Sequence, residues 1–148
     1  MPRYSTSQFY SNYDDLLAIQ RGYADALLEC HGHCAIGDEW DGIGPQDFSR
    51  DVLRQIYIDC EAFLKAAIVI HPEGEDGLMR DIDEYDLGFN FYLDRQRTGV
   101  GFRDLSLGEL GEHLEECAAS FGWVEVMLTP DRRIALPPSP LAPAKLTN

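Results

Sequence analysis

Hydrophobic residues recur along the 148-residue chain with two different spacings, and each spacing predicts a different kind of element. In the stretches 14–30 and 45–70, apolar residues recur every three to four positions, which is typical of an amphipathic helix. The expected buried stripes are Leu16, Leu17, Tyr23, Ala24, Leu27 and Leu28 in the first stretch, and Phe48, Val52, Ile56, Cys60, Phe63, Leu64 and Ala67 in the second. The sequence therefore predicts two long helices, with a short third helix over 78–85.

A different spacing begins at residue 87. Phe89, Phe91 and Leu93 alternate with Asn90 and Tyr92, and such alternation is typical of a half-buried strand. The polar residues 94–98 and the glycine that follows predict a reversal of the chain. The alternation then resumes over 100–102, so we expect an aromatic β-hairpin in this region.

A helix with marked ends is predicted after the hairpin. Ser106 and Glu109 have the spacing of a capping box, and Gly122 stands where a helix often ends in a left-handed residue. The apolar residues of 123–128 predict a strand, a turn around Pro130 follows, and residues 134–136 predict a last strand.

This order of elements predicts an α+β fold, in which N-terminal helices pack on a small antiparallel sheet whose C-terminal order is β-β-α-β(-β). The length fits one domain with a sizeable core. We assign residues 13–136 to this domain and residues 1–12 to a flexible arm. Residues 137–148 contain four prolines and are expected to form a Pro-rich flexible tail.

Net charge narrows the classes of partner. The 26 acidic residues outnumber the 12 basic ones, which gives a net charge of −14 and a pI near 4.4. Such a chain repels phosphates, so direct binding to nucleic acid is disfavoured and basic partners are favoured. The charge is concentrated in 72–118, where thirteen acidic and four basic residues give a net of −9. This segment is either a solvated surface that promotes solubility or an acidic face that binds a basic groove on another protein.

Several motifs lie within this acidic segment. The aromatic stretch is Gly88-Phe89-Asn90-Phe91-Tyr92-Leu93, and Gly101-Phe102 and Asp104 follow it. The expected helix then reads Leu107-Gly108-Glu109-Leu110-Gly111-Glu112-His113-Leu114. These residues resemble a family of small uncharacterised actinophage and mobile-element proteins with an aromatic hairpin and an L-G-x-x-G-x-x-L helix. This chain has Phe89-Asn90 where that family usually has His-Asp, and Arg97-Thr98 where it tends to have a His. The resemblance implies a phage origin and work inside a bacterial host, and it implies no reaction.

Together, charge and resemblance favour a non-catalytic phage protein that inhibits a host defence complex of the anti-CRISPR or anti-restriction type. It would place an acidic surface on a basic nucleic-acid-binding groove. The carboxylates expected on that surface are Asp81, Asp83, Glu84, Asp86, Glu109, Glu112 and Glu116. Tyr92, Arg95 and Arg97 of the expected hairpin would add an aromatic anchor and a polar contact patch. The alternatives are a zinc-stabilised accessory phage protein and a phage component that assembles into a homo-oligomer.

A cluster of metal-binding residue types supports the zinc alternative. The cluster is Cys30, His31, His33 and Cys34, in which the two cysteines and either histidine would supply three ligands of the kind that zinc prefers. A fourth would have to come from Cys60, His71, His113 or Cys117, if the fold brings one of them near. Against this, cysteines on apolar stripes, such as Cys60 and Cys117, behave as small hydrophobic residues. Ordinary core and loop roles are therefore favoured, and we expect no bound metal or cofactor.

Catalytic motifs are not found in this sequence. The glycines at 99 and 101 lack the strand-to-helix context of a phosphate-binding loop. His113 and Cys117 are expected on different faces of their helix. We therefore expect a binding protein and no enzyme. The chain also has no apolar run long enough to span a bilayer and no apolar leader at its start, so we expect a cytoplasmic protein in the bacterial host cell.

Overall fold

The computed structural model describes residues 12–34 and 39–138, without the side chains of residues 32–34. Most of the predicted arm, and most of the predicted tail, lie outside these residues. The described elements in chain order are η1 (Tyr13–Asp15), α2 (Ala18–Cys34), η2 (Pro45–Asp47), α3 (Arg50–Ile70), α4 (Gly74–Asp81), α5 (Glu84–Arg95), η3 (Phe102–Leu105), α6 (Glu109–Ser120), β1 (Met127–Leu128) and β2 (Ile134–Ala135).

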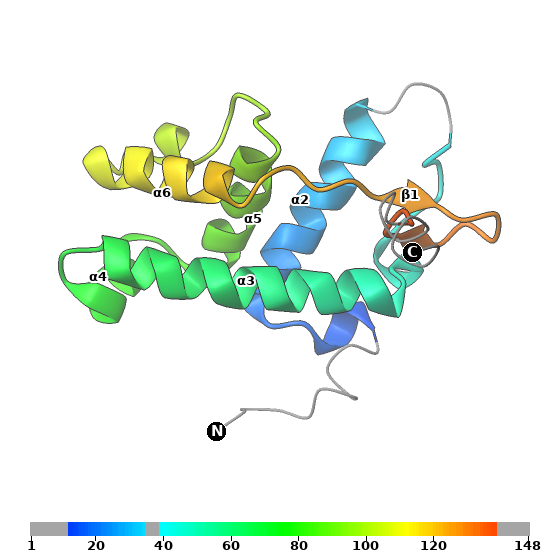
Figure 1. Ribbon diagram of the computed structural model, residues 1–148, viewed down its shortest axis with the longest axis horizontal. Helices are drawn as coiled ribbons and strands as arrows, with labels where there is room; N and C mark the ends of the chain where they lie inside the picture. The colour runs from blue at the N-terminus through cyan, green and yellow to red at the C-terminus, as the bar shows by residue number, and fades with distance from the viewer. Residues whose placement is uncertain (1–11, 35–38, 139–148) are drawn as a thin grey trace, which may run out of the picture.

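The predicted α+β fold is wrong. Within the described residues the protein is mostly helical, and its sheet is one antiparallel pair in which Met127 lies opposite Ala135 and Leu128 opposite Ile134. Figure 1 shows α3 running along the whole molecule, with α4 and α6 at one end and the β1–β2 pair at the other. There is no β-β-α-β(-β) arrangement among these elements.

The long helix α3 is the helix expected from the apolar stripe. Ser49 caps its N-terminus, since the Ser49 hydroxyl accepts a hydrogen bond from the amide of Val52 at 3.3 Å. The helix continues through Ile70, as predicted, although the residues from Pro45 form the separate turn η2. Its buried residues are Val52, Leu53, Ile56, Cys60, Phe63 and Ala67. One face of α3 therefore lies against the core along its length.

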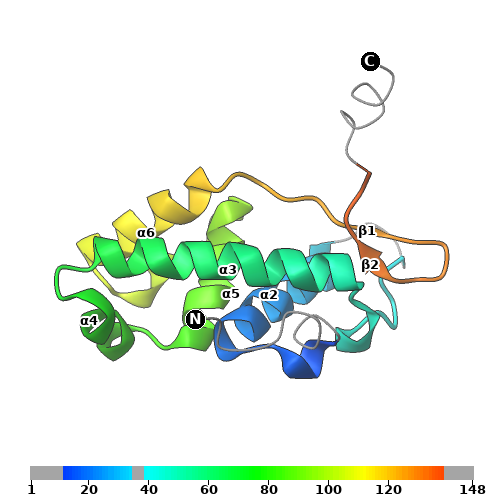
Figure 2. The same ribbon diagram turned by 60° about the horizontal axis from the view of Figure 1, so that its bottom comes forward.

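Helix α5 occupies the stretch for which a hairpin was predicted. Asp83 caps it by accepting a hydrogen bond from the amide of Asp86 at 2.8 Å. Its buried residues are Leu87, Gly88, Asn90, Phe91, Tyr92, Asp94 and Arg95, because α2, α6 and η3 all pack against it. Figure 2 shows α5 lying behind α3 and next to α2. The buried side of α5 includes the polar residues Asn90, Asp94 and Arg95, whereas Phe89 and Leu93 are only partly buried, so its apolar residues do not follow the helical spacing.

Stacked aromatic rings at the centre of the molecule join three helices. The rings of Phe63 on α3 and Phe91 on α5 lie parallel, with centroids 4.2 Å apart. Phe121, at the end of α6, meets both rings edge-on, and Phe102 of η3 lies 5.8 Å from Phe63. Phe91 and Phe102, predicted to lie on paired strands, therefore meet in a helical core.

The ends of α6 differ in part from the expectation. Ser106 is a left-handed residue that ends η3, with φ of 58°, and its predicted capping box with Glu109 is not formed. Gly108 is the residue that precedes the helix instead. At the other end Gly122 has φ of 80°, which confirms the predicted left-handed termination.

A hairpin closes the described part of the chain. The Thr129 amide donates to the carbonyl of Arg133 at 2.9 Å, so the predicted turn around Pro130 is confirmed. Strand β2 also bridges to Phe48 in parallel, and the Ser49 amide donates to the carbonyl of Ile134 at 2.8 Å. The hairpin is thereby fixed to the residues that precede α3.

Candidate functional site

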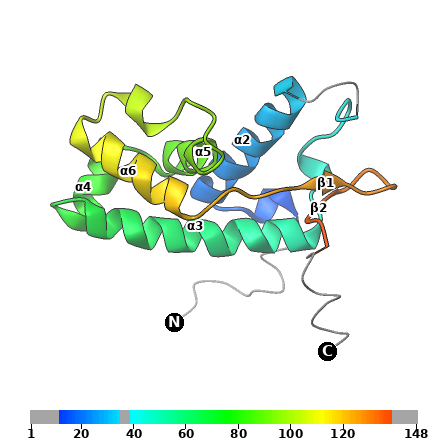
Figure 3. The same ribbon diagram turned by 45° about the horizontal axis from the view of Figure 1, so that its top comes forward.

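The expected acidic residues lie on α4, on the start of α5 and on α6. All three views place α4 and α6 at the end of the molecule where α3 terminates (Figures 1–3). Seven exposed carboxylates form what we call the acidic face: Glu75, Asp76, Glu84, Asp86, Glu109, Glu112 and Glu116. None of the seven makes a hydrogen bond or ion pair through its side chain to another described residue. The acidic face is therefore free to bind.

Two carboxylates of the same region have structural partners instead. Arg80 bridges Glu73 and Asp81, with its Nη2 2.6 Å from Glu73 Oε1 and its Nε 3.1 Å from Asp81 Oδ1. Asp81 also lies 2.7 Å from Nε2 of the buried His71. The hydrogen bonds from Arg80, followed by that from His71, hold the pKa of Asp81 below its usual value. Asp81, expected on the contact surface, thus ties α4 to the end of α3.

The His71 ring has a defined role in this cluster. Its Nδ1 accepts a hydrogen bond from the amide of Glu73 at 3.0 Å, so the proton lies on Nε2 and is donated to Asp81. The ring packs directly on Gly77, where an added Cβ would come within 2.3 Å of it. The short helix α4 is therefore held in place by a buried imidazole, and its exposed carboxylates are presented on a fixed element.

The start of α5 combines a cap with an exposed charge. Asp83, another of the expected contact residues, uses its carboxylate to cap the helix. Desolvation, and then the neighbouring charge of Asp83, raise the pKa of Asp86 above its usual value. Glu84 is exposed and makes no such bond within the described residues. Of this group, Glu84 and Asp86 offer charge to a partner, while Asp83 supports the helix.

The N-terminal half of α6 borders an open depression of about 360 Å³, lined by Arg103, Gly108 and Glu112. Arg103 is held beside it by an ion pair with Glu115, whose carboxylate is 2.6 Å from Arg103 Nε. Glu112 and Glu116 are one helical turn apart and both exposed, so they form a short row of carboxylates on α6. The depression is polar and shallow and is suited to a contact surface.

Two of the expected contact residues lie in the interior. Tyr92 is 2% exposed and Arg95 is 6% exposed, so neither side chain reaches a surface partner. The hairpin that would have presented them is a helix, and both residues point into its packed surroundings. Only Arg97 of the three is exposed, in the turn after α5, where its φ is 55°. Tyr92 and Arg95 are therefore not part of the contact surface for which they were predicted.

Arg95 instead lies at the centre of a buried polar cluster that the sequence did not indicate. Its Nη1 donates to Asp59 Oδ2 at 2.7 Å and to the hydroxyl of Tyr23 at 3.0 Å. Its Nε donates to the carbonyl of Gly122 at 2.8 Å, and its Nη2 to that of Phe121 at 3.3 Å. The guanidinium also lies over the rings of Phe91 and Phe121. The cluster joins α2, α3 and α5 to the end of α6.

A second buried carboxylate, Asp94, stabilises the loop that follows α5. Its Oδ2 accepts a hydrogen bond from the amide of Phe102 at 2.9 Å. Gly101 packs against this carboxylate, and an added Cβ there would lie 2.2 Å from Asp94 Oδ1. Desolvation raises the pKa of Asp94 to about 6, and the charges of Glu115 and Asp104 act in the same direction. Asp94 is thus a titrating group inside the fold.

The residues of the zinc hypothesis lie at the end of α2. The His31 ring stacks on Trp40, with centroids 4.4 Å apart, and burial lowers its pKa. Cys30 is half-buried on the same helix. The side chains of His33 and Cys34 lie outside the described residues. Among the side chains that are described, no three of His, Cys, Asp or Glu gather at a point where they could hold a metal ion.

No family model, no curated protein and no solved structure matches this chain. The resemblance to actinophage proteins therefore stays a prediction. In the part of the chain that the structure describes, none of the helices has both the length and the apolar character needed to cross a membrane.

Proposed function

We propose that this chain is a non-catalytic binding protein whose acidic face docks on a basic, nucleic-acid-binding groove of a bacterial host defence complex. The observation that carries the proposal is that seven exposed carboxylates without internal partners lie on α4, on the start of α5 and on α6, and that α4 and α6 lie at the same end of the molecule. Carboxylates without internal partners keep their full charge for an external cation, whereas paired ones do not.

The positions of several arginines support a difference in charge between the two ends of the molecule. At the opposite end, Arg50 and Arg54 lie on the first turns of α3, and Arg132 and Arg133 lie in the β1–β2 turn. The Arg133 guanidinium donates to the carbonyl of Phe48 at 2.8 Å, which brings the two groups together. These arginines offset the acidic residues around them. A basic groove would therefore be steered towards the α4–α6 end of the protein.

The elements that carry the acidic face are fixed before a partner arrives. The His71–Asp81–Arg80 cluster holds α4, the Asp83 cap holds the start of α5, and the Arg95 cluster holds the end of α6. A charged surface on fixed elements loses less conformational entropy on binding than one on loops. This favours a docking role for the whole face.

The test compares two variants that change the net charge equally. The first carries Glu84→Lys, Glu112→Lys and Glu116→Lys in the acidic face, and the second carries Glu29→Lys, Glu39→Lys and Asp41→Lys elsewhere. Tagged wild type and control should retain the same nucleic-acid-handling complex from bacterial lysate at low salt, and added duplex DNA should displace it. The face variant, checked by circular dichroism for folding, should retain none. Equal retention by the face variant, or no displacement by DNA, would refute the proposal.

A further inference from the structure

An extended segment, residues 123–128, connects α6 to β1 along the outside of the molecule (Figure 3). Exposure alternates along it. Trp123, Glu125 and Met127 are exposed, and the residues between them are partly buried. This alternation is that of a strand with one face on the core, although only its last two residues pair with another strand.

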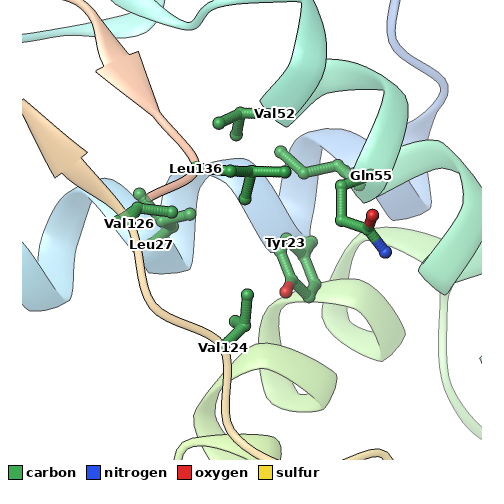
Figure 4. Close-up of a pocket in the computed structure, with 8 residues that line it drawn as sticks. Tyr23, Leu27, Val52, Gln55, Val124, Val126 and Leu136 are labelled. Carbon is green, nitrogen blue, oxygen red and sulfur yellow. The ribbon is translucent and has the colours of Figure 1, made fainter. Parts of the chain in front are cut away.

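The inner side chains fix the segment against two helices. Figure 4 shows Val124, Val126 and Leu136 directed into the space between α2 and α3, where they meet Tyr23 and Val52. The space that remains between these side chains is about 10 Å³. The segment is therefore held in its extended form by packing, and its register cannot shift by one residue without exposing both valines.

The two backbone edges of the segment have different surroundings. The hydrogen bond from the Thr129 amide to Arg133 means that Thr129 and Met127 direct their backbone groups towards β2. By the alternation of a strand, Val126 and Leu128 direct theirs to the opposite side. On that side, the backbone of Val126 makes no hydrogen bond to any described residue. We call this side the free edge.

Gln96 already occupies the beginning of the free edge. Its side-chain amide donates to the carbonyl of Val124 and accepts from the amide of Val124, both at 2.8 Å. This pair of bonds is the one that a neighbouring strand would make at that residue. The other edge of the sheet is already occupied, because β2 bridges to Phe48. The free edge beside β1 is thus the place where a further strand can add.

The outward side chains define the partner. Trp123 is 66% exposed and Met127 is 38% exposed, and Glu125 between them has no ion pair within the described residues. A second copy of this chain would bring two molecules of net charge −14 together and is therefore disfavoured. We propose that the free edge binds an extended basic peptide of a partner protein as an added strand, with lysine or arginine beside Glu125 and apolar residues beside Trp123 and Met127. This proposal does not depend on the acidic face.

The probe for this proposal is a short synthetic peptide that alternates valine and lysine, and binding is followed by the fluorescence of Trp123 and by backbone amide shifts. The peptide should perturb the amides of Val126 and Leu128. Alternate amides of the peptide can be N-methylated in two ways, at the odd or at the even positions. One of these two peptides should bind roughly tenfold more weakly or worse, because N-methylation removes the donors to the free edge. A matched valine–glutamate peptide should not bind.

Two variants distinguish binding at the free edge from general electrostatic attraction of the peptide. Glu125→Lys should weaken the lysine peptide roughly five- to tenfold, as expected for a reversed cross-strand pair. Glu29→Lys makes the same change of charge on an exposed position of α2, outside the acidic face, and should leave the affinity nearly unchanged. The proposal would be overturned if neither N-methylated peptide bound more weakly, or if both variants changed the affinity equally. A concentration-dependent dimer that forms without peptide through the same amides would also overturn it.

Discussion

Gly88 of α5 lies directly against the backbone carbonyl of Ile19 on α2, so closely that a Cβ on Gly88 would stand 1.8 Å from that oxygen. The contact is reciprocal one turn away, where a Cβ on Gly22 would stand 2.0 Å from the carbonyl oxygen of Tyr85. The two helix backbones meet without side chains between them, and this is the most extensive helix pairing in the described part of the fold.

Gly88→Ala should therefore separate α2 from α5. We expect a loss of about 3 kcal/mol in the free energy of unfolding, at the upper end for overpacked sites, since backbone and not a flexible side chain blocks the new methyl. Urea denaturation measures it. The control is Gly99→Ala, where nothing lies within 4 Å of the new Cβ and the cost is that of a φ of 92°, about 1–2 kcal/mol. Equal losses in the two variants would argue against the close crossing.

Gly88 also contributes to the reason why the sequence of α5 predicted a β-hairpin. A glycine and three alternating apolar residues, Phe89, Phe91 and Leu93, are as compatible with a strand as with a helix that packs against several other elements. The pattern cannot distinguish the two, because only contacts with α2, α6 and η3 decide which positions are buried, and these include the polar Asn90, Asp94 and Arg95. A local signal was present, since Asp83 precedes the helix with the spacing of an N-cap, and it was not used.

Elements with one solvated face were predicted well. The stripe of α3, the helix end at Gly122 and the turn around Pro130 depend on local spacing and turn chemistry, and the structure confirms them. The exposed acidic residues were also found from the sequence. The roles of Arg95 and Asp59 were not, because their contact joins residues 36 positions apart and no local pattern records it.

Arg95→Met should remove the donors of the buried cluster. Asp59 would then keep a charge in a site where its side chain is 13% exposed, and the carbonyls of Phe121 and Gly122 would lose their partner. We expect a loss of about 3–5 kcal/mol, as for other broken buried ion pairs. Thermal and urea unfolding measure it, with Arg103→Met of the exposed pair with Glu115 as the control, for which we expect about 1 kcal/mol or less.

A double substitution tests the cause. Adding Asp59→Asn to Arg95→Met removes the unpaired charge, so part of the lost stability should return. If the two losses add instead, the cluster does not act through the charge of Asp59.

The stability of the protein should depend on pH through Asp94. Its folded-state pKa is raised to about 6 from an ordinary value of 3.8, so the folded protein binds the proton more tightly than the unfolded chain does. The resulting stabilisation is fully present below about pH 4 and is lost as the pH rises through about 6. Because the site is partly solvated, the loss should be on the order of 1–2 kcal/mol.

Asp94→Asn is the variant that isolates this group from the other carboxylates. Its amide keeps an acceptor for the amide of Phe102 and carries no charge, so the variant should match the wild type at pH 4.5 and exceed it at pH 7.5 in urea denaturation. Parallel curves for the two proteins across this range would show that Asp94 does not titrate in the folded state.

Gln96→Ala should release the segment that follows α6. The amide and carbonyl of Val124 lose both partners, and unpaired backbone groups at a partly buried site cost about 1–3 kcal/mol. Amide hydrogen exchange should increase at Val124 and remain unchanged in α3, because the two hydrogen bonds that are lost belong to Val124 and not to α3. Gln96→Glu is the informative partner variant. Its carboxylate still accepts from the Val124 amide but faces the Val124 carbonyl without a donor, so it should fall between wild type and alanine. A fully protected Val124 in the alanine variant would mean that the segment is held by packing alone.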